Sequence, residues 1–355
     1  MKNIHNYQNQ QDGHMVKGQG LHTQYMNKIK LVWRCSAIAI TLYAIWIFNS
    51  DLKNIQQVEN FNIKLILLGV FFAFLNYLLR ALRWHWLLNK SGEDISISKS
   101  FLSFFSGFFY TFTPGKIGEV AKSLHLYDLT KIPARKSLPI IWIERTSDVA
   151  GVTMLCFPIV IYMVLKNKQY LYQNSIELVL MSWFSGIIAM LLLYIIAKSL
   201  VKKIASKSVP QQERKEFVKT FLETLEMLRK NMPQLLLWGW FAWVLEGVTC
   251  FLCLEAIFPN FPIFQDNNTN ILLLEKITAL TRFYSSSMLA GALSFIPGGL
   301  GATELTLTNL LILSGFEETI ASSGTFLTRI ATLWVGFPIG IISVLKINNK
   351  KRESL

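Results

Sequence analysis

The sequence predicts an all-α fold, a polytopic bundle of transmembrane helices. Of its 355 residues, 52% are hydrophobic and only 16% are charged, whereas soluble domains carry about 25% charged residues. The mean hydropathy is +0.37. The hydrophobic residues also gather in long runs, and a bilayer span needs about 20 such residues in succession. Composition and patterning together exclude an ordinary soluble domain.

Seven apolar runs approach the length of a membrane span. They cover residues 31–47, 63–79, 152–165, 176–197, 235–257, 271–296 and 325–345. The run 101–112 is too short to cross a bilayer, so we expect it to be re-entrant. The run 305–314 with its flanks supplies a short further crossing. The sequence thus predicts about eight spans, with two broken or re-entrant helices.

The placement of the basic residues predicts the orientation of the chain. The net charge is +13. Lys and Arg cluster at 28–34, 80–90, 116–136, 198–230 and 346–352. Basic loops favour the cytoplasmic side of a membrane. We therefore expect a multi-pass protein of the cell inner (cytoplasmic) membrane, with both chain ends and both helix breaks described below on the cytoplasmic side.

The chain divides into one large domain and two tails. Residues 1–27 are polar and predict a disordered cytoplasmic tail, residues 28–346 predict the transmembrane domain, and residues 347–355 a second cytoplasmic tail. Within the domain, residues 210–230 predict a basic amphipathic helix that lies on the inner leaflet and attracts anionic headgroups. The alternative is a solvated linker helix.

Two Pro-Gly-x-x-Gly motifs interrupt apolar stretches. Their residues are Pro114, Gly115, Lys116, Gly118 and Glu119 in the first, and Pro297, Gly298, Gly299, Gly301 and Glu304 in the second. Proline and glycine let the backbone turn sharply. A helix that begins after such a turn offers unpaired N–H groups to an anion. We therefore expect an anion site at these glycines and Lys116; the alternative is an ordinary turn with a solvated lysine.

The two motifs are the strongest sign of an internal repeat. Each proline is followed, 31 or 32 residues later, by an arginine inside an apolar run, Arg145 or Arg329. The two half-repeats would cover about 62–197 and 234–346. Transporters are often built from such repeats, with the binding site where broken helices of the two halves meet. A chance similarity is the alternative.

Charged residues inside apolar runs mark candidate binding or orienting groups. Glu144 lies beside Arg145, and Asp148 follows three residues later, at the spacing of a same-face ion pair. Arg329 has no carboxylate at this spacing, so its partner is Glu304, Glu246 or a ligand. Charge inside a membrane is costly and usually functional. An ion pair that only locks two helices together is the alternative.

Other polar residues suggest no chemistry. Arg80, Arg83 and Trp84 close the run 63–79, and we interpret them as anchors at the membrane interface. The cysteines lie in apolar runs and are read as buried thiols. We find no metal site, no cofactor site and no nucleophile–base arrangement, and we expect no nucleic-acid binding. His125 with Asp128 is the one thin candidate for catalysis.

The ordered set of motifs resembles a known family. It consists of Arg80-x-x-Arg83-Trp84, the break at Pro114, Glu144-Arg145-x-x-Asp148, and the break at Pro297 with Glu304 and Arg329. Together they are similar to the lysylphosphatidylglycerol synthase transmembrane-region family, also called flippase-like membrane proteins. The likeness covers about 28–346. Thr303 departs from the pattern, because many relatives place a basic residue there, and the soluble aminoacyltransferase domain of two-domain members is not expected in this chain.

The resemblance implies a protein that moves an anionic or phosphate-bearing lipid between leaflets, such as an aminoacylated phospholipid or a polyprenyl-phosphate-linked sugar. Arg145, Arg329 and the glycines of the breaks would bind its headgroup. Glu119, Asp148 and Glu304 would orient the arginines or bind a cationic headgroup such as that of an aminoacyl lipid. The partners implied are anionic membrane lipids, with a homo-oligomer or a lipid-synthesis enzyme also open. The alternative function is a membrane subunit or partner of a lipid-modifying glycosyl or aminoacyl transferase; a small-anion transporter and a structural scaffold form a third class.

Overall fold

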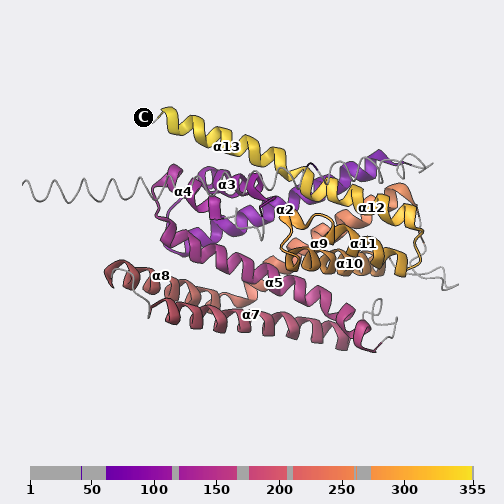
Figure 1. The fold of residues 1–355 in the computed structure, drawn as a ribbon, viewed down its shortest axis with the longest axis horizontal. Coiled ribbons are helices and arrows are strands. Elements are labelled where there is room, and N and C mark those ends of the chain that lie inside the picture. Colours follow the sequence, from indigo (N-terminus) through magenta and orange to yellow (C-terminus); the bar gives the residue numbers. More distant parts are fainter. Residues whose placement is uncertain are drawn as a thin grey trace, which may run out of the picture.

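The chain forms a bundle of helices (Figure 1). This computed structural model describes residue 41 and residues 61–113, 120–165, 176–205, 211–259, 261 and 273–353. Every regular element within these ranges is helical, which confirms the all-α prediction. The predicted span 31–47 and the tail 1–27 lie outside the described residues, apart from Thr41.

The helices fall into two similar groups separated by a connecting pair. The first group is α2 (Ile63–Lys90), α3 (Ile97–Ser106), the 3-10 turn η1 (Gly107–Tyr110), α4 (Ala121–Thr130) and α5 (Ala134–Leu165). The connecting pair is α7 (Ile176–Ala205) and α8 (Gln211–Lys230). The second group is α9 (Met232–Ile257), α10 (Leu273–Leu293), the turn η3 (Pro297–Gly299), α11 (Ala302–Leu313), α12 (Glu318–Arg329), the π-helical segment η4 (Ile330–Trp334) and α13 (Gly336–Glu353).

Four helices of the described part are long and apolar enough to cross a membrane. They are Ile63–Lys90, Ile176–Val201, Met232–Ile257 and the continuous helix Glu318–Arg352, which joins α12, η4 and α13. A helical membrane bundle is therefore confirmed. These four do not include the run 305–314, which the predicted total of eight counted as a crossing.

The first break lies in a re-entrant hairpin, which we call hairpin 1 (97–130, α3 to α4). Both of its ends lie at the end of the bundle where α2 and α13 finish. Asp128, near the end of α4, pairs with Lys351 of α13 at 3.0 Å. Lys136, at the start of α5, forms an ion pair with Glu93, just after α2. We call this end of the bundle the basic end.

The second break lies in a matching hairpin, hairpin 2 (273–313, α10 to α11), that comes from the opposite end. Lys276, near the start of α10, donates to the carbonyl of Phe261 at 2.9 Å. Phe316, just after α11, packs on the same Phe261, with ring centroids 5.1 Å apart. Both ends of hairpin 2 therefore lie where α9 finishes. α11 has 12 residues, about 18 Å of helix, too short to cross.

Two expectations from the sequence are thus wrong. The run 305–314 is one arm of a hairpin rather than a crossing, and the two breaks do not enter from one side. The charge map misled because hairpin 2 carries few basic residues of its own, so its side was assigned from its neighbours along the chain.

Phe112, a described residue of hairpin 1, meets the second break inside the bundle. Phe112, two residues before Pro114, is 1% exposed and clusters with Leu300 and Phe326. A side-chain carbon built on Gly298 would lie 3.0 Å from its ring. The close approach explains why glycine occupies position 298, where φ is also +65°. The predicted site residues Gly115, Lys116, Gly118 and Glu119 themselves lie outside the described residues.

The two groups of helices have the same order and opposite directions. Each consists of a long helix, a broken hairpin and a second long helix. The first helices of the two groups are antiparallel, since the N–H of Asn62 before α2 donates to the carbonyl of Ala256 near the end of α9 at 2.8 Å. We infer an inverted-topology repeat, the arrangement in which transporters place a binding site between their halves.

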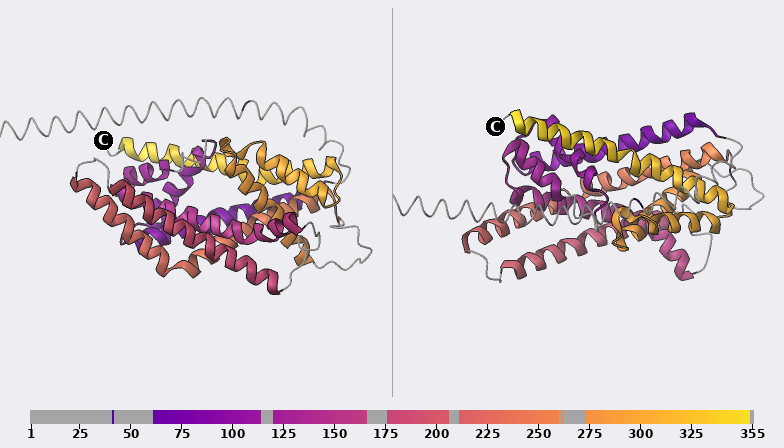
Figure 2. Two further views of the ribbon diagram at one scale, coloured as in Figure 1. Left: turned by 60° about the horizontal axis from the view of Figure 1, so that its bottom comes forward. Right: turned by 45° about the horizontal axis from the view of Figure 1, so that its top comes forward.

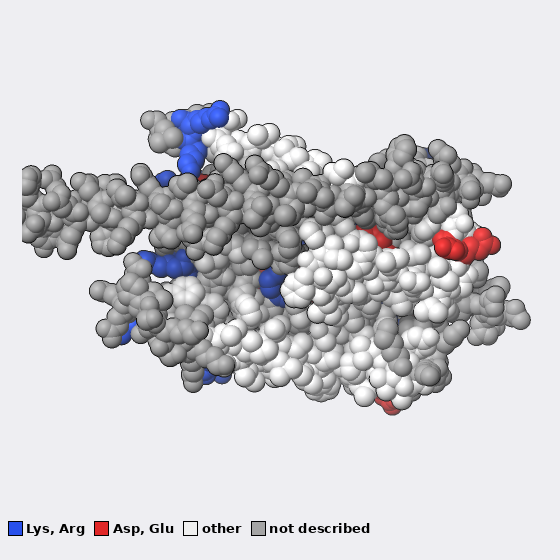
Figure 3. Space-filling model, in the orientation of Figure 1, with Lys and Arg blue, Asp and Glu red and all other residues white. Residues whose placement is uncertain are grey.

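Outer helices and surface charge complete the architecture. In both views of Figure 2, α7 and α8 lie on the opposite side of the bundle from α13. α8 buries Leu225 and Leu228 and contacts α5 and α7. Figure 3 shows Lys and Arg gathered toward the basic end, at the left, and acidic residues toward the other end.

The hairpin geometry predicts a specific labelling pattern. On a Cys35→Ser background, Asp94→Cys and Lys131→Cys flank hairpin 1, and we expect an impermeant maleimide to label both from one side of the membrane. Glu317→Cys, after hairpin 2, should react only from the other side. Labelling after lysis provides the accessibility control. If the Glu317→Cys variant reacted from the same side as the Lys131→Cys variant, the opposed hairpins would be contradicted.

Candidate functional site

A cavity of about 350 Å³ lies where the two hairpins meet. Its walls come from both groups of helices, from α2, α3, η1, α4 and α5 in the first and from α9, α10, η3, α11, α12, η4 and α13 in the second. Among the described residues, six charged side chains line it: Arg80, Lys122, Arg145, Asp148, Glu246 and Arg329. Charged groups at this depth of a membrane protein are costly unless they are paired or meet a ligand, so the cavity is the candidate functional site.

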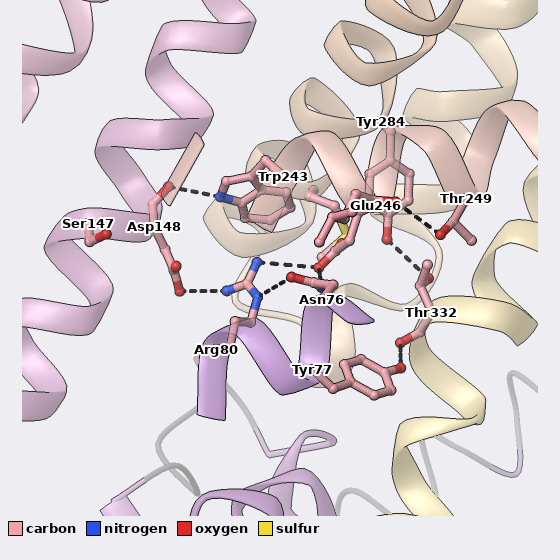
Figure 4. Close-up of polar contacts among 12 residues, drawn as sticks. Asn76, Tyr77, Arg80, Ser147, Asp148, Trp243, Glu246, Thr249, Tyr284 and Thr332 are labelled. Carbon is pink, nitrogen blue, oxygen red and sulfur yellow. Dashed lines mark hydrogen bonds and ion pairs between the residues drawn. The ribbon is translucent and has the colours of Figure 1, made fainter. Parts of the chain in front are cut away.

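Arg80 of α2 links three helices at the centre of the cavity (Figure 4). Its guanidinium pairs with Asp148 of α5 at 2.9 Å and with Glu246 of α9 at 3.3 Å. The same group lies 5.1 Å from the ring centroid of Trp243, a cation–π geometry. Asn76, one turn earlier on α2, accepts from Arg80 at 3.0 Å and donates to Glu246 at 2.6 Å. One residue thus fixes the positions of α5 and α9 relative to α2.

Asp148 forms ion pairs with three guanidinium groups. Arg80 and Arg145 each approach its Oδ2 at 2.9 Å, and Arg83 donates to its Oδ1 at 2.8 Å. The predicted same-face pair of Arg145 and Asp148 is therefore present. Arg145 is the most exposed of the three, with 33% of its side chain accessible. One carboxylate held by three cations leaves positive charge on the cavity wall.

Glu144 pairs with a lysine of hairpin 1 and not with its neighbour Arg145. It is fully buried and forms an ion pair with Lys122 of α4, while Arg83 approaches it at 3.9 Å. The ammonium of Lys122 lies 4.5 Å from the ring centroid of Trp84. This pair ties hairpin 1 to α5, on the cavity wall.

Arg329 and Glu304 form the corresponding pair of the second half. Arg329 is 1% exposed, and its Nε lies 2.6 Å from Glu304 Oε1. Its Nη2 donates to the carbonyl of Gly298 at 2.9 Å. Of the partners considered from the sequence, Glu304 is the one in contact. Arg329 thus holds the broken segment of hairpin 2 against α12.

The hypothesis that N–H groups of the second break bind an anion needs correction at two glycines. The N–H of Gly299 donates to the carbonyl of Ile296 at 2.9 Å. The N–H of Gly301 donates to Glu304 Oε2 at 2.6 Å, as in a capping box. Both N–H donors are therefore occupied within the protein. The positive charge that this half presents to the cavity comes from Arg329 instead.

The interpretation of Arg83 and Trp84 as interface anchors is also wrong. Their side chains are 1% and 0% exposed. Trp84 Nε1 donates to Ser103 of α3 at 3.2 Å, and Arg83 donates to Ser147 of α5 at 3.0 Å. Both residues point into the bundle with Arg80, because they share the inward face of α2.

Two tyrosines connect the halves through the π-helical segment. Tyr77 of α2 donates to the backbone carbonyl of Thr332, and Tyr284 of α10 donates to the hydroxyl of the same Thr332 at 3.0 Å (Figure 4). A π-helical turn interrupts the regular helical hydrogen bonds and frequently marks a functional position. Here it follows Arg329 directly, so both halves contact the helix that carries this arginine.

Sequence reasoning missed Asn76, Trp243 and Lys122 and the inward direction of Arg80 and Arg83, although signals exist for most of them. Asn76, Arg80 and Arg83 recur at helical spacing and so form one polar face in an apolar helix. Trp243 and Glu246 have the same relation on α9. Lys122 had no such signal, because it lies in a basic stretch that looks solvated.

The residues considered for catalysis, His125 and Asp128, form hydrogen bonds with other residues and not with each other. Asp128 pairs with Lys351, and His125 contacts Tyr110 at 3.4 Å. The thiols of Cys156, Cys250 and Cys253 are buried. In the described ranges no group of three or more His, Cys, Asp or Glu side chains is placed to hold a metal ion.

Comparison with known proteins identifies the family. Residues 35–340 match the family described as lysylphosphatidylglycerol synthase TM region. This chain belongs to that family. It is also 25% identical over 339 residues to the UPF0104 membrane protein PH1989 of Pyrococcus horikoshii, covering 87% of this chain and 95% of that protein. The resemblance seen in the motifs is thus confirmed across nearly the whole chain.

The buried pair of Arg329 and Glu304 predicts non-additive effects on stability. Arg329→Gln or Glu304→Gln alone should each cost about 3–5 kcal/mol, because each leaves a buried charge without its partner. The double variant should lose clearly less than the sum. Apparent unfolding temperatures in detergent measure this, with Arg229→Gln, which breaks the exposed pair with Glu226, as the control. Additive losses would show that the two residues do not depend on each other.

Proposed function

We propose that this protein translocates a phosphate-bearing lipid between the leaflets of the cytoplasmic membrane. The observation that carries the proposal is the cation-lined cavity at the meeting point of two opposed re-entrant hairpins. A lipid headgroup must cross the hydrophobic layer without losing all of its hydrogen bonds. A polar site inside the bundle supplies hydrogen-bond partners that replace the water molecules lost by the headgroup.

The charges of the site favour an anion. The described cluster contains five cations, Arg80, Arg83, Lys122, Arg145 and Arg329, and four carboxylates, Glu144, Asp148, Glu246 and Glu304. A bound phosphate would balance the excess. Arginine forms bidentate, charge-assisted hydrogen bonds with phosphate oxygens, and Arg145 is the arginine most open to the cavity.

The surroundings of the cavity favour a lipid over a free anion. Three apolar residues that line it, Val149, Phe295 and Ile296, are 39%, 72% and 42% exposed. A headgroup can therefore enter beside Arg145 while its hydrocarbon chain stays in the bilayer. Glu246 and Asp148 on the same wall would suit a cationic group on the headgroup, as in an aminoacylated lipid; a polyprenyl-phosphate-linked sugar offers the phosphate alone.

The proposed orientation follows the surface charge. The basic end faces the cytoplasm under the positive-inside rule, so hairpin 1 enters from the cytoplasmic side and hairpin 2 from the opposite side. The C-terminus then lies in the cytoplasm. Passive exchange between the leaflets requires no further component.

Purified protein in liposomes tests the proposal. Fluorescent lipids with anionic headgroups are added to both leaflets, and a quencher that cannot cross the membrane is added outside. Translocation brings the inner-leaflet lipid to the quencher, so quenching should go well beyond half of the signal. Quenching that stops at half for every phosphate-bearing lipid, as in liposomes without protein, would overturn the proposal.

Arg145→Gln should slow translocation by roughly ten- to a hundredfold. A charge-assisted hydrogen bond contributes about 1.5–3 kcal/mol, and about 1.4 kcal/mol corresponds to a factor of ten. Arg135→Gln is the matched control, because Arg135 lies near the start of the same helix and forms only an exposed pair with Glu216 at 3.3 Å. Initial rates in the liposome assay give the comparison. Equal rates for the two variants would exclude Arg145 from the pathway.

A further inference from the structure

A second concave site lies between α3 and α13, at the basic end of the bundle. Its volume is about 680 Å³, and none of its lining residues belongs to the central cavity. Phe101 and Phe105 of α3 form one wall, and Ile339 and Ile342 of α13 form the other. We call this site the α3–α13 groove.

Two lysines give the groove a polar end. Lys346 and Lys350 also line it, both are exposed, and neither forms an ion pair with a described residue. The neighbouring Lys351 takes the nearby carboxylate, Asp128, at 3.0 Å. The groove therefore combines an apolar wall with two cations at its outer end.

The dimensions of the groove match one leaflet. Ile339 and Lys350 are 11 residues apart on a continuous helix, about 16 Å. Half of the hydrocarbon layer of a bilayer is about 15 Å. A hydrocarbon chain that lies on Ile339 and Ile342 thus places its headgroup beside Lys346 and Lys350, at the level where lysine meets lipid phosphate.

We propose that the α3–α13 groove binds an anionic phospholipid and loads it toward the central cavity. The lysines hold the phosphate, and the two phenylalanines and two isoleucines contact one acyl chain. The loading role rests on the proposed translocation, whereas the binding itself does not. Charge complementarity at the outer end selects this occupant over a neutral lipid.

The fold connects the groove to the cavity. Phe101 and Phe105 line the groove, whereas Phe104 and Phe108, on another face of hairpin 1, line the cavity. Between the two sites Phe109 packs on Phe337 of α13, with ring centroids 6.0 Å apart, and Gly340 lies against the backbone of Phe109. Among the described residues, the contacts of Phe109 and Phe112 with Phe337 lie between a lipid in the groove and the cavity.

A fluorescent reporter in the groove tests the binding. On the Cys35→Ser background, Ile342→Cys is labelled with bimane, and the protein is reconstituted with brominated phosphatidylglycerol or brominated phosphatidylcholine at equal mole fraction. Ile342 is 53% exposed, so labelling leaves the bundle intact. We expect quenching at several-fold lower mole fraction of the anionic lipid, and we expect Lys346→Gln/Lys350→Gln to abolish this preference.

A charge-matched control separates local binding from net charge. Lys215→Gln/Lys219→Gln removes two exposed lysines from α8 and should keep the preference. Equal quenching by the two lipids, or equal loss in the control, would overturn the site. Absence of quenching by either lipid would mean that protein covers the groove and would overturn it as well.

Translocation measured in the same vesicles keeps the two proposals apart. Preference for the anionic lipid without translocation supports the groove and overturns the proposed function. Translocation without preference overturns the groove alone. If both hold, Lys346→Gln/Lys350→Gln should slow translocation at low mole fraction of anionic lipid and not at saturation.

Discussion

The centre of this protein depends on the sharing of Asp148 among three arginines. Arg80 and Arg83 from α2 and Arg145 from α5 all contact it. Each of these charges would be costly inside an apolar bundle on its own. Held together, they fix α2 against α5, and Arg80 adds α9 through Glu246. The arrangement stabilises the bundle and leaves the cavity wall positively charged.

The same constraint explains the two hairpins. A broken helix inside a membrane exposes backbone groups that protein, water or a ligand must satisfy. In hairpin 2, Glu304 accepts from Gly301, and Arg329 donates to Gly298. Arg329, which bonds the backbone of the break, thus also lines the cavity. The contact of Arg329 with Glu304 stabilises the break, and the same contact fixes the position of the arginine proposed to meet a ligand.

The sequence predicted the helical class, the first broken segment, the partnership of Arg145 with Asp148 and Glu304 as one of the partners open to Arg329. These follow from local patterns: hydrophobic runs, a three-residue spacing and a charge in an apolar segment. It did not predict the inward direction of Arg83, the pair of Lys122 with Glu144 or the opposed entry of hairpin 2. Each of those depends on which distant helices pack together, and a single sequence records no such contact.

The opposed hairpins also bear on how a lipid would move. Hairpin 1 and hairpin 2 reach the cavity from different ends, and Thr332 receives a tyrosine from each half. A movement of Thr332 would therefore alter contacts in both halves, as alternating access between repeats requires. The π-helical segment after Arg329 is the position in the long helix α12–α13 where such a change meets the least regular hydrogen bonding.

The most direct measurement is a high-resolution map of the protein in lipid nanodiscs that contain an anionic phospholipid. The account predicts phosphate density in the cavity within hydrogen-bonding distance of Arg145, with its hydrocarbon chain leaving past Phe295. A cavity that holds only water at the same lipid content, with the arginines bonded to Asp148 and Glu304 alone, would contradict it.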